Sequence, residues 1–190
     1  MIDASDDLID TCCRRTEPAT PVSGDDLLPA SLRSGLLSMR TVLDAPPGGV
    51  WQWLTRPDLL ARWSPVVPDR ALITVGAAEA RESPLSAVVD ATVVEVFEPF
   101  RLVHRWGADT LTWQLGPADT GTQLQLVHQL TARDSYADVA AGWHLCLDVL
   151  ARSISGQAAE RLVGADAVSA GWAPLRDAYR DRIVPNDADD

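Results

Sequence analysis

Between residues 101 and 130, apolar and polar residues alternate along the chain. Because successive side chains of a β-strand point to opposite faces of a sheet, this alternation predicts three strands, over 101–107, 109–115 and 121–130. Each strand gathers large side chains on one face and places mainly arginine, threonine or glutamine on the other. The predicted inward set is Leu102, His104, Trp106, Leu111, Trp113, Leu115, Leu124, Leu126, His128 and Leu130.

Shorter apolar runs, separated by glycine and proline, predict further strands at 36–43, 70–76, 78–82 and 87–97. Their spacing suits antiparallel hairpins. The last of these runs does not divide cleanly by parity, because Val93 shares a face with Glu95 while Val94 and Val96 oppose them. We therefore expect a β-bulge in this strand, where the register changes.

A longer period follows in residues 135–155, which predict one helix of about 30 Å at 1.5 Å per residue. Its apolar stripe should face the concave side of the sheet. The members of the stripe are Val139, Trp143, Cys146, Leu147, Leu150 and Ile154. Gly142 in the middle of this helix costs about 1 kcal/mol relative to alanine, which suggests the close approach of a strand or a ligand.

Three shorter helices complete the predicted elements. Prolines 46 and 47 can open a helix over 50–54, and Asp58 can cap a second one over 59–63. A last helix is predicted over 172–183. The sequence thus describes an α+β domain in which a curved antiparallel sheet closes on a long helix, an arrangement that leaves a pocket between them.

Composition and charge argue against several classes of protein. The chain has 190 residues, 46% of them apolar, and a net charge of −11 from 16 basic and 27 acidic residues. No apolar run approaches the ~18 residues of a membrane span, and the acidic start does not resemble a secretory signal, so we expect a cytoplasmic protein. The acidic charge and the absence of a basic stripe argue against nucleic-acid binding. Every basic residue is arginine, which excludes lysine chemistry.

Proline, glycine and acidic residues divide the chain into three parts. Residues 1–30 are predicted to be an acidic, disordered arm that contains the free thiols of Cys12 and Cys13. Residues 31–156 form the predicted domain. Residues 157–190 are predicted to be a connector and a C-terminal helix that docks on the domain.

Four segments carry a resemblance to a known family: Val50–Trp63, Val96–Trp106, Gly121–His128, and Gly142-Trp143 with Leu147 and Leu150. In this order they resemble the START-like (SRPBCC) superfamily, and within it the bacterial branch named for the activator of the heat-shock protein 90 ATPase. The resemblance covers about residues 36–156. It implies a helix-grip fold, with a hydrophobic cavity between an antiparallel sheet and a long C-terminal helix, and with two short helices after the first strand.

We expect the cavity to be lined by aromatic and aliphatic side chains. The predicted ligand-binding residues are Trp63, His104, Trp106, Trp113, Leu115, Leu126, His128, Trp143, Leu147 and Leu150. The two histidines have three alternatives: a structural role, hydrogen bonding to a ligand, or acid–base chemistry. Two histidines without a convergent cysteine or carboxylate fall short of a zinc site, and we predict neither a metal nor a cofactor.

Three functions are consistent with these features. The favoured one is a non-enzymatic binding protein for a small hydrophobic or aromatic molecule, with no catalytic residue assigned. The second is an interaction protein like the co-chaperone branch, with a chaperone or other protein as its partner. The third is an enzyme of the cyclase, aromatase or hydrolase type that uses His104 or His128. A monomer and a homodimer are both open.

Overall fold

The structure is a computed structural model that describes residues 27–183. The predicted arm, except for its last four residues, and both of its cysteines lie outside these residues. The strands are β1 (Ala30–Arg33), β2 (Leu36–Leu43), β3 (Val67–Pro68), β4 (Glu79–Arg81), β5 (Val89–Asp90), β6 (Val93–Phe97), β7 (Arg101–Trp106), β8 (Asp109–Pro117) and β9 (Thr122–Gln129). The helices are α1 (Pro47–Thr55), α2 (Pro57–Leu60), the 3₁₀ turn η2 (Arg133–Ser135), α3 (Tyr136–Ile154), α4 (Ala165–Ser169) and α5 (Trp172–Arg182).

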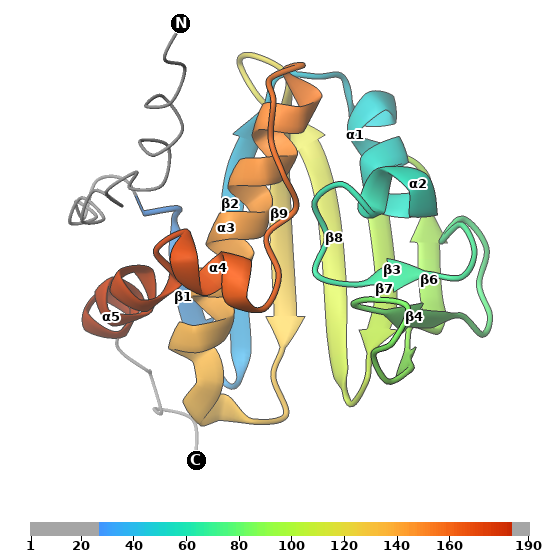
Figure 1. Ribbon diagram of the computed structural model, residues 1–190. Helices are drawn as coiled ribbons and strands as arrows, with labels where there is room; N and C mark the ends of the chain where they lie inside the picture. Colours follow the sequence, from blue (N-terminus) through green and yellow to red (C-terminus); the bar gives the residue numbers. More distant parts are fainter. Residues whose placement is uncertain (1–26, 184–190) are drawn as a thin grey trace, which may run out of the picture.

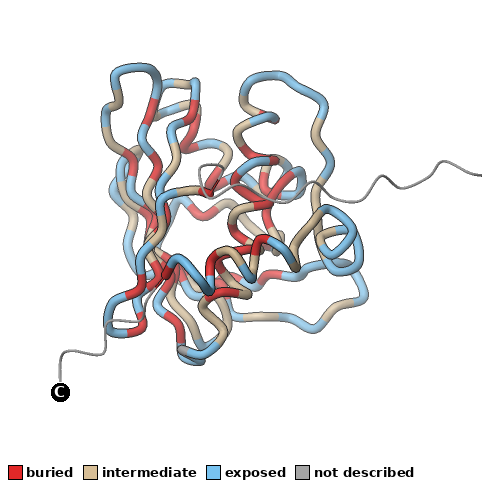
Figure 2. The backbone as a smooth tube through the Cα atoms, turned by 90° about the vertical axis from the view of Figure 1, so that its left-hand side faces the viewer, coloured by how far each residue is buried: buried red, intermediate tan, exposed pale blue. Residues whose placement is uncertain are grey.

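Six strands form one antiparallel sheet in the order β1-β2-β9-β8-β7-β6, and β3, β4 and β5 form a small second sheet. Figure 1 shows α3 across one face of the large sheet, with α1, α2 and the small sheet in front of β7 and β6. The view in Figure 2 places these elements on one side of the large sheet, with the buried residues between the layers. The predicted α+β helix-grip architecture is confirmed.

The parity prediction for the three central strands is also confirmed. His104 of β7 lies opposite Leu111 of β8, and Leu111 lies opposite His128 of β9. Nine of the ten predicted inward residues are buried, and Trp106 is half-buried. The opposite face carries mostly polar side chains, as expected for an antiparallel sheet with one solvated face.

The structure corrects the prediction of a strand over 70–76. The described residues form no strand there, apart from a single bridge between Gly76 and Val93. The loop instead closes around Arg70, whose guanidinium donates to the carbonyl oxygens of residues 71, 74, 76 and 77. The Arg70 side chain thus binds the carbonyl groups of this segment, although Gly76 also exchanges main-chain hydrogen bonds with Val93 of β6. The apolar pattern alone does not reveal the bonds of Arg70.

Residues 87–97 form two strands instead of one. β5 belongs to the small sheet and β6 to the large sheet, and the register of β6 against β7 shifts between Val93 and Glu95. The expected irregularity is therefore confirmed at this place. Within residues 27–183, no helix has the length and apolar character that crossing a bilayer requires.

Helix α3 is buried on more than the predicted stripe. Leu145 and Val149 are buried as well, and α5 packs against α3. His144 of α3 bonds the hydroxyl of the fully buried Tyr179 of α5, at 2.9 Å. α3 is thus held between the sheet and α5, and its orientation over the sheet is fixed from both sides.

Candidate ligand-binding site

Two buried histidines of the sheet accept hydrogen bonds from tryptophan. The indole Nε1 of Trp113 donates to Nε2 of His104 at 3.1 Å, and the other ring nitrogen, Nδ1, lies 2.9 Å from the carbonyl oxygen of Arg105. An indole N–H can only donate, so Nε2 is the acceptor and the proton resides on Nδ1. Burial lowers the pKa of His104 to about 4, and this ring is neutral at neutral pH.

His128 repeats the arrangement across the next strand pair. Nε1 of Trp143 in α3 donates to Nδ1 of His128 at 3.1 Å, and Nε2 of His128 lies 3.0 Å from a carboxylate oxygen of Asp109. Burial lowers the pKa of His128, although Asp109 opposes this shift. Partial burial pushes the pKa of Asp109 upward, but hydrogen bonds from Thr131 and His128 outweigh it and leave the pKa below its usual value.

The two tryptophans belong to a continuous aromatic cluster. The rings of Trp113 and Trp143 meet edge to face, with centroids 5.4 Å apart, and Trp143 meets Trp106 in the same way at 5.2 Å. Trp106 also stacks on His128 at 5.4 Å with an interplanar angle of 24°. Such pairs each contribute about 0.5–1.5 kcal/mol beyond the burial of their area. The cluster is therefore a rigid wall between the sheet and α3.

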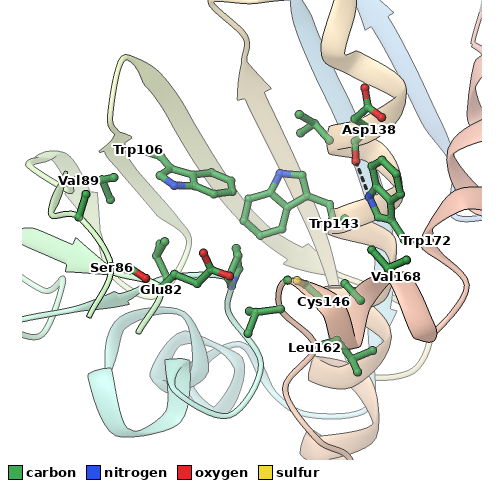
Figure 3. Close-up of a pocket in the computed structure, with 18 residues that line it drawn as sticks. Glu82, Ser86, Val89, Trp106, Asp138, Trp143, Cys146, Leu162, Val168 and Trp172 are labelled. Atoms are coloured by element: carbon green, nitrogen blue, oxygen red, sulfur yellow. Dashed lines mark hydrogen bonds between the residues drawn. The ribbon is translucent and has the colours of Figure 1, made fainter. Parts of the chain in front are cut away.

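A cavity of about 620 Å³ opens beside this wall. Figure 3 shows Trp106 and Trp143 on its inner side and Trp172 at its far end. The lining residues are Pro65, Val66, Glu82, Ser86, Ala87, Val89, Trp106, Asp138, Val139, Gly142, Trp143, Cys146, Leu162, Val163, Gly164, Ala167, Val168 and Trp172. Most of these side chains are apolar. The volume falls within the ~300–1,000 Å³ typical of sites for small molecules.

Of the ten predicted site residues, the structure places Trp106 and Trp143 in the lining of this cavity. His104 and Trp113 instead line a much smaller space of about 20 Å³, which Trp106 and Trp143 also border. The other six lie in the packed core: Trp63, Leu115, Leu126, His128, Leu147 and Leu150. Parity identifies inward side chains, but most inward side chains here contact one another, leaving little space for a ligand.

Much of the cavity wall comes from residues that the sequence did not single out as site residues. Glu82, which follows β4, and Val89 of β5 form one side, and residues 162–172 after α3 form the outer side. Glu82 and Val89 lay in predicted strands, Val139 in the predicted stripe of the long helix, and Trp172 in the predicted last helix. None of these patterns indicates that the residues meet at a cavity.

Gly142 faces the cavity instead of a neighbouring strand. A Cβ atom added at this position would meet no atom within 4 Å, so the close approach of a strand, one of the two expected reasons for this glycine, is absent. The missing side chain instead leaves part of the cavity floor open next to Trp143. This is the one position of α3 where the lining is bare main chain.

Arg161 fixes the outer wall in place. Its guanidinium donates to the carbonyl oxygens of Ser64, Pro65 and Glu82, which belong to two loops on the other side of the cavity. Burial lowers the pKa of Arg161, while attraction to Glu82 opposes the shift. Trp172 adds a second attachment, because its indole N–H donates to the carbonyl oxygen of Asp138 in α3.

The two buried histidines and Cys146 are poorly disposed for acid–base or nucleophilic chemistry. Both nitrogens of each buried histidine are engaged, so neither ring offers a free lone pair to a substrate. Cys146 lines the cavity, but burial raises the pKa of its thiol to about 12, far from the thiolate that a nucleophile requires. Within residues 27–183, no group of three or more histidine, cysteine or acidic side chains is arranged to hold a metal ion.

Comparison with known proteins agrees with this geometry. The sequence model of the family described as Activator of Hsp90 ATPase homolog 1-like protein matches residues 44–155. None of the curated proteins matches the chain. The match ends at α3, and the residues at 162–172 that line the cavity lie beyond it.

Solved structures share the fold at low sequence identity. CalU16 from Micromonospora echinospora is 21% identical, with a TM-score of 0.59, and the alignment covers 77% of this chain and 86% of CalU16. EF2215 from Enterococcus faecalis, a conserved protein of unknown function, is 17% identical with a TM-score of 0.60, over 82% and 89% of the two chains. DynU16, from the dynemicin biosynthetic locus, is 22% identical with a TM-score of 0.56, over 65% and 49%.

The neutral state of His104 predicts acid sensitivity. The pKa of His104 is about 4 in the folded protein and 6.5 in the unfolded chain. The neutral ring therefore adds its full share to the free energy of unfolding above pH 6.5, and this share is lost as the pH falls from 6.5 to 4. The difference between the two pKa values corresponds to roughly 3 kcal/mol. Urea unfolding at several pH values should show this decline, and His104→Gln, which keeps an acceptor for Trp113, should flatten it. A smaller dependence on pH should remain in this variant because of His128. If the free energy of unfolding of wild type and of His104→Gln varied with pH in parallel, His104 would not be neutral in the fold.

Removing the Arg161 clamp should loosen the outer wall. We expect Arg161→Met to lower the free energy of unfolding by roughly 2 kcal/mol, because three carbonyl groups lose a charged donor. Arg152→Met is the matched control, since Arg152 is exposed and pairs only with the exposed Asp148. Its loss should cost less than about 0.5 kcal/mol. Faster hydrogen exchange of residues 157–164 in the Arg161 variant alone would support the clamp, and equal effects of the two variants would contradict it.

Proposed function

The chain belongs to the Activator of Hsp90 ATPase homolog 1-like family, and from this premise we propose that it binds a small apolar or aromatic molecule in the cavity beside α3. The observation that carries the proposal is the cavity of about 620 Å³ with a mostly apolar lining. An open apolar concavity leaves nonpolar surface in contact with water, and such surface is typical of sites for small molecules. The aromatic wall gives a planar ligand a surface on which to stack.

Rigidity of the wall supports binding over catalysis. Trp143 is held by its hydrogen bond to His128 and by ring contacts on two sides, so its position does not have to be fixed when a ligand arrives. A site that is ordered in advance loses less conformational entropy on binding. The same hydrogen bonds engage the nitrogens that acid–base chemistry would need, so we infer that the histidines serve to position tryptophans.

Filling the cavity from Gly142 tests the proposal. Gly142→Phe places a ring in open space from a helix position where phenylalanine is more favourable than glycine, so the fold should be retained. We expect it to weaken binding of the neutral fluorescent probe N-phenyl-1-naphthylamine by at least about tenfold, or 1.4 kcal/mol. Fluorescence titration measures the probe, and the melting temperature reports the fold.

Gly142→Ala provides the matched control. It makes the same backbone change with little loss of volume, so binding should change little while stability rises by up to about 1 kcal/mol. If the wild-type protein does not bind the probe or related planar apolar molecules, or if Gly142→Phe binds as well as wild type, the cavity is not the binding site.

The same variant separates ligand binding from the alternative of a co-chaperone. The family's description names activation of the Hsp90 ATPase, and such a role would use the outer surface of the domain. Gly142→Phe changes the interior of the cavity and leaves that surface intact. An effect on a chaperone ATPase that persists in this variant would favour the interaction role over the proposed one.

A further inference from the structure

We infer, on the basis of the binding role proposed above, that the ligand carries a positive charge, and that Glu82 and the indole of Trp106 recognise it. The charged residues that line the cavity are all acidic. Its ionisable lining residues, apart from the protonated Cys146, are Glu82 and Asp138, and none of the described residues in the lining carries a positive charge. A ligand with an anionic group would find no partner there.

The two carboxylates are oriented differently. In Figure 3 the Glu82 side chain points toward the space below Trp106 and Trp143, whereas the Asp138 carboxylate points away from the cavity. Among the described residues, no basic side chain forms an ion pair with Glu82. Arg161 is attracted to Glu82, but its guanidinium donates to the main-chain carbonyl oxygen and leaves the carboxylate available to a ligand.

Trp106 supplies the second recognition element. One face of its indole stacks on His128, and the half-buried side chain also lines the cavity. The ring also meets Trp143 edge to face, so a ligand reaches the indole on the side that borders the cavity. Tryptophan is the aromatic side chain that attracts cations most strongly, through the negative potential over its ring. A cationic head between this side of the indole and the Glu82 carboxylate would gain from both groups, while its apolar part occupies the rest of the cavity.

This arrangement describes a class of molecule: a small aromatic or aliphatic amine, or a quaternary ammonium compound, with an apolar body. Because Glu82 is exposed, its contribution is partly screened by water and salt. We therefore expect a preference of about fivefold and not of several orders of magnitude. The preference should decrease at high ionic strength.

Three probes of nearly the same shape test the charge of the ligand. They are (2-naphthylmethyl)trimethylammonium, its neutral tert-butyl analogue 2-neopentylnaphthalene, and the anion 2-naphthylmethanesulfonate, each measured by displacement of N-phenyl-1-naphthylamine. Because the neutral probe is more apolar, the informative quantity is the change in relative affinity between variants. Glu82→Gln should reduce the affinity for the ammonium probe about fivefold, relative to the neutral probe.

Glu79→Gln is the matched control, because Glu79 of β4 is an exposed glutamate three residues from Glu82 and does not line the cavity. It should leave the relative affinities unchanged. If no probe binds, the proposed binding function itself fails. If the probes bind but Glu82→Gln leaves the ratio of ammonium to neutral affinity unchanged, or if the anion binds most tightly, the inference about charge is wrong while the cavity remains a binding site. Equal effects of the two variants would indicate that the overall negative charge of the protein attracts the cation, and not Glu82 in particular.

Discussion

The interior of this domain depends on hydrogen bonds from indole N–H groups to buried, neutral imidazoles. A buried polar group without a partner costs free energy, and here four such groups satisfy one another in two pairs. The pair formed by Trp143 and His128 joins α3 to β9, while the pair formed by Trp113 and His104 joins β8 to β7. The helix therefore has a defined rotation and height over the sheet. Apolar packing alone would specify these less sharply, since it is not directional.

The cavity follows from that fixed position. α3 is held by the His128 bond on the sheet side and by α5 on the other, so it cannot move inward to fill the space next to Gly142. The small sheet and the loop around Glu82 cannot move in either, because Arg161 fixes that loop and the connector at a set separation. The empty volume is thus a consequence of directional bonds around it, where a core held only by apolar contacts would tend to collapse.

The outer wall of the cavity lies beyond the residues that the family model matches. The family match ends at residue 155, yet Leu162, Val168 and Trp172 complete the cavity. The matched residues include Trp106 and Trp143 of the inner wall, and residues 162–172 close the cavity from outside. The lining offers a carboxylate and no cation. The proposed binding site is thus built on a widely shared fold, and fold membership alone does not identify the ligand.

The sequence by itself determined the order of most strands and helices, the inward faces of β7, β8 and β9, and the stripe of α3, because these depend on local periods of two and 3.6 residues. It also identified both histidines as inward and Gly142 as unusual. The tertiary structure decided what these residues do: it paired each histidine with a tryptophan, left Gly142 facing a cavity, and placed Leu126 and Leu150 in solid core. Glu82 lies at the end of a predicted strand and Leu162 in the predicted connector, and only folding brings them together at one cavity. Arg70 shows the same limit, because its bonds to four carbonyls made a loop where the apolar pattern predicted a strand.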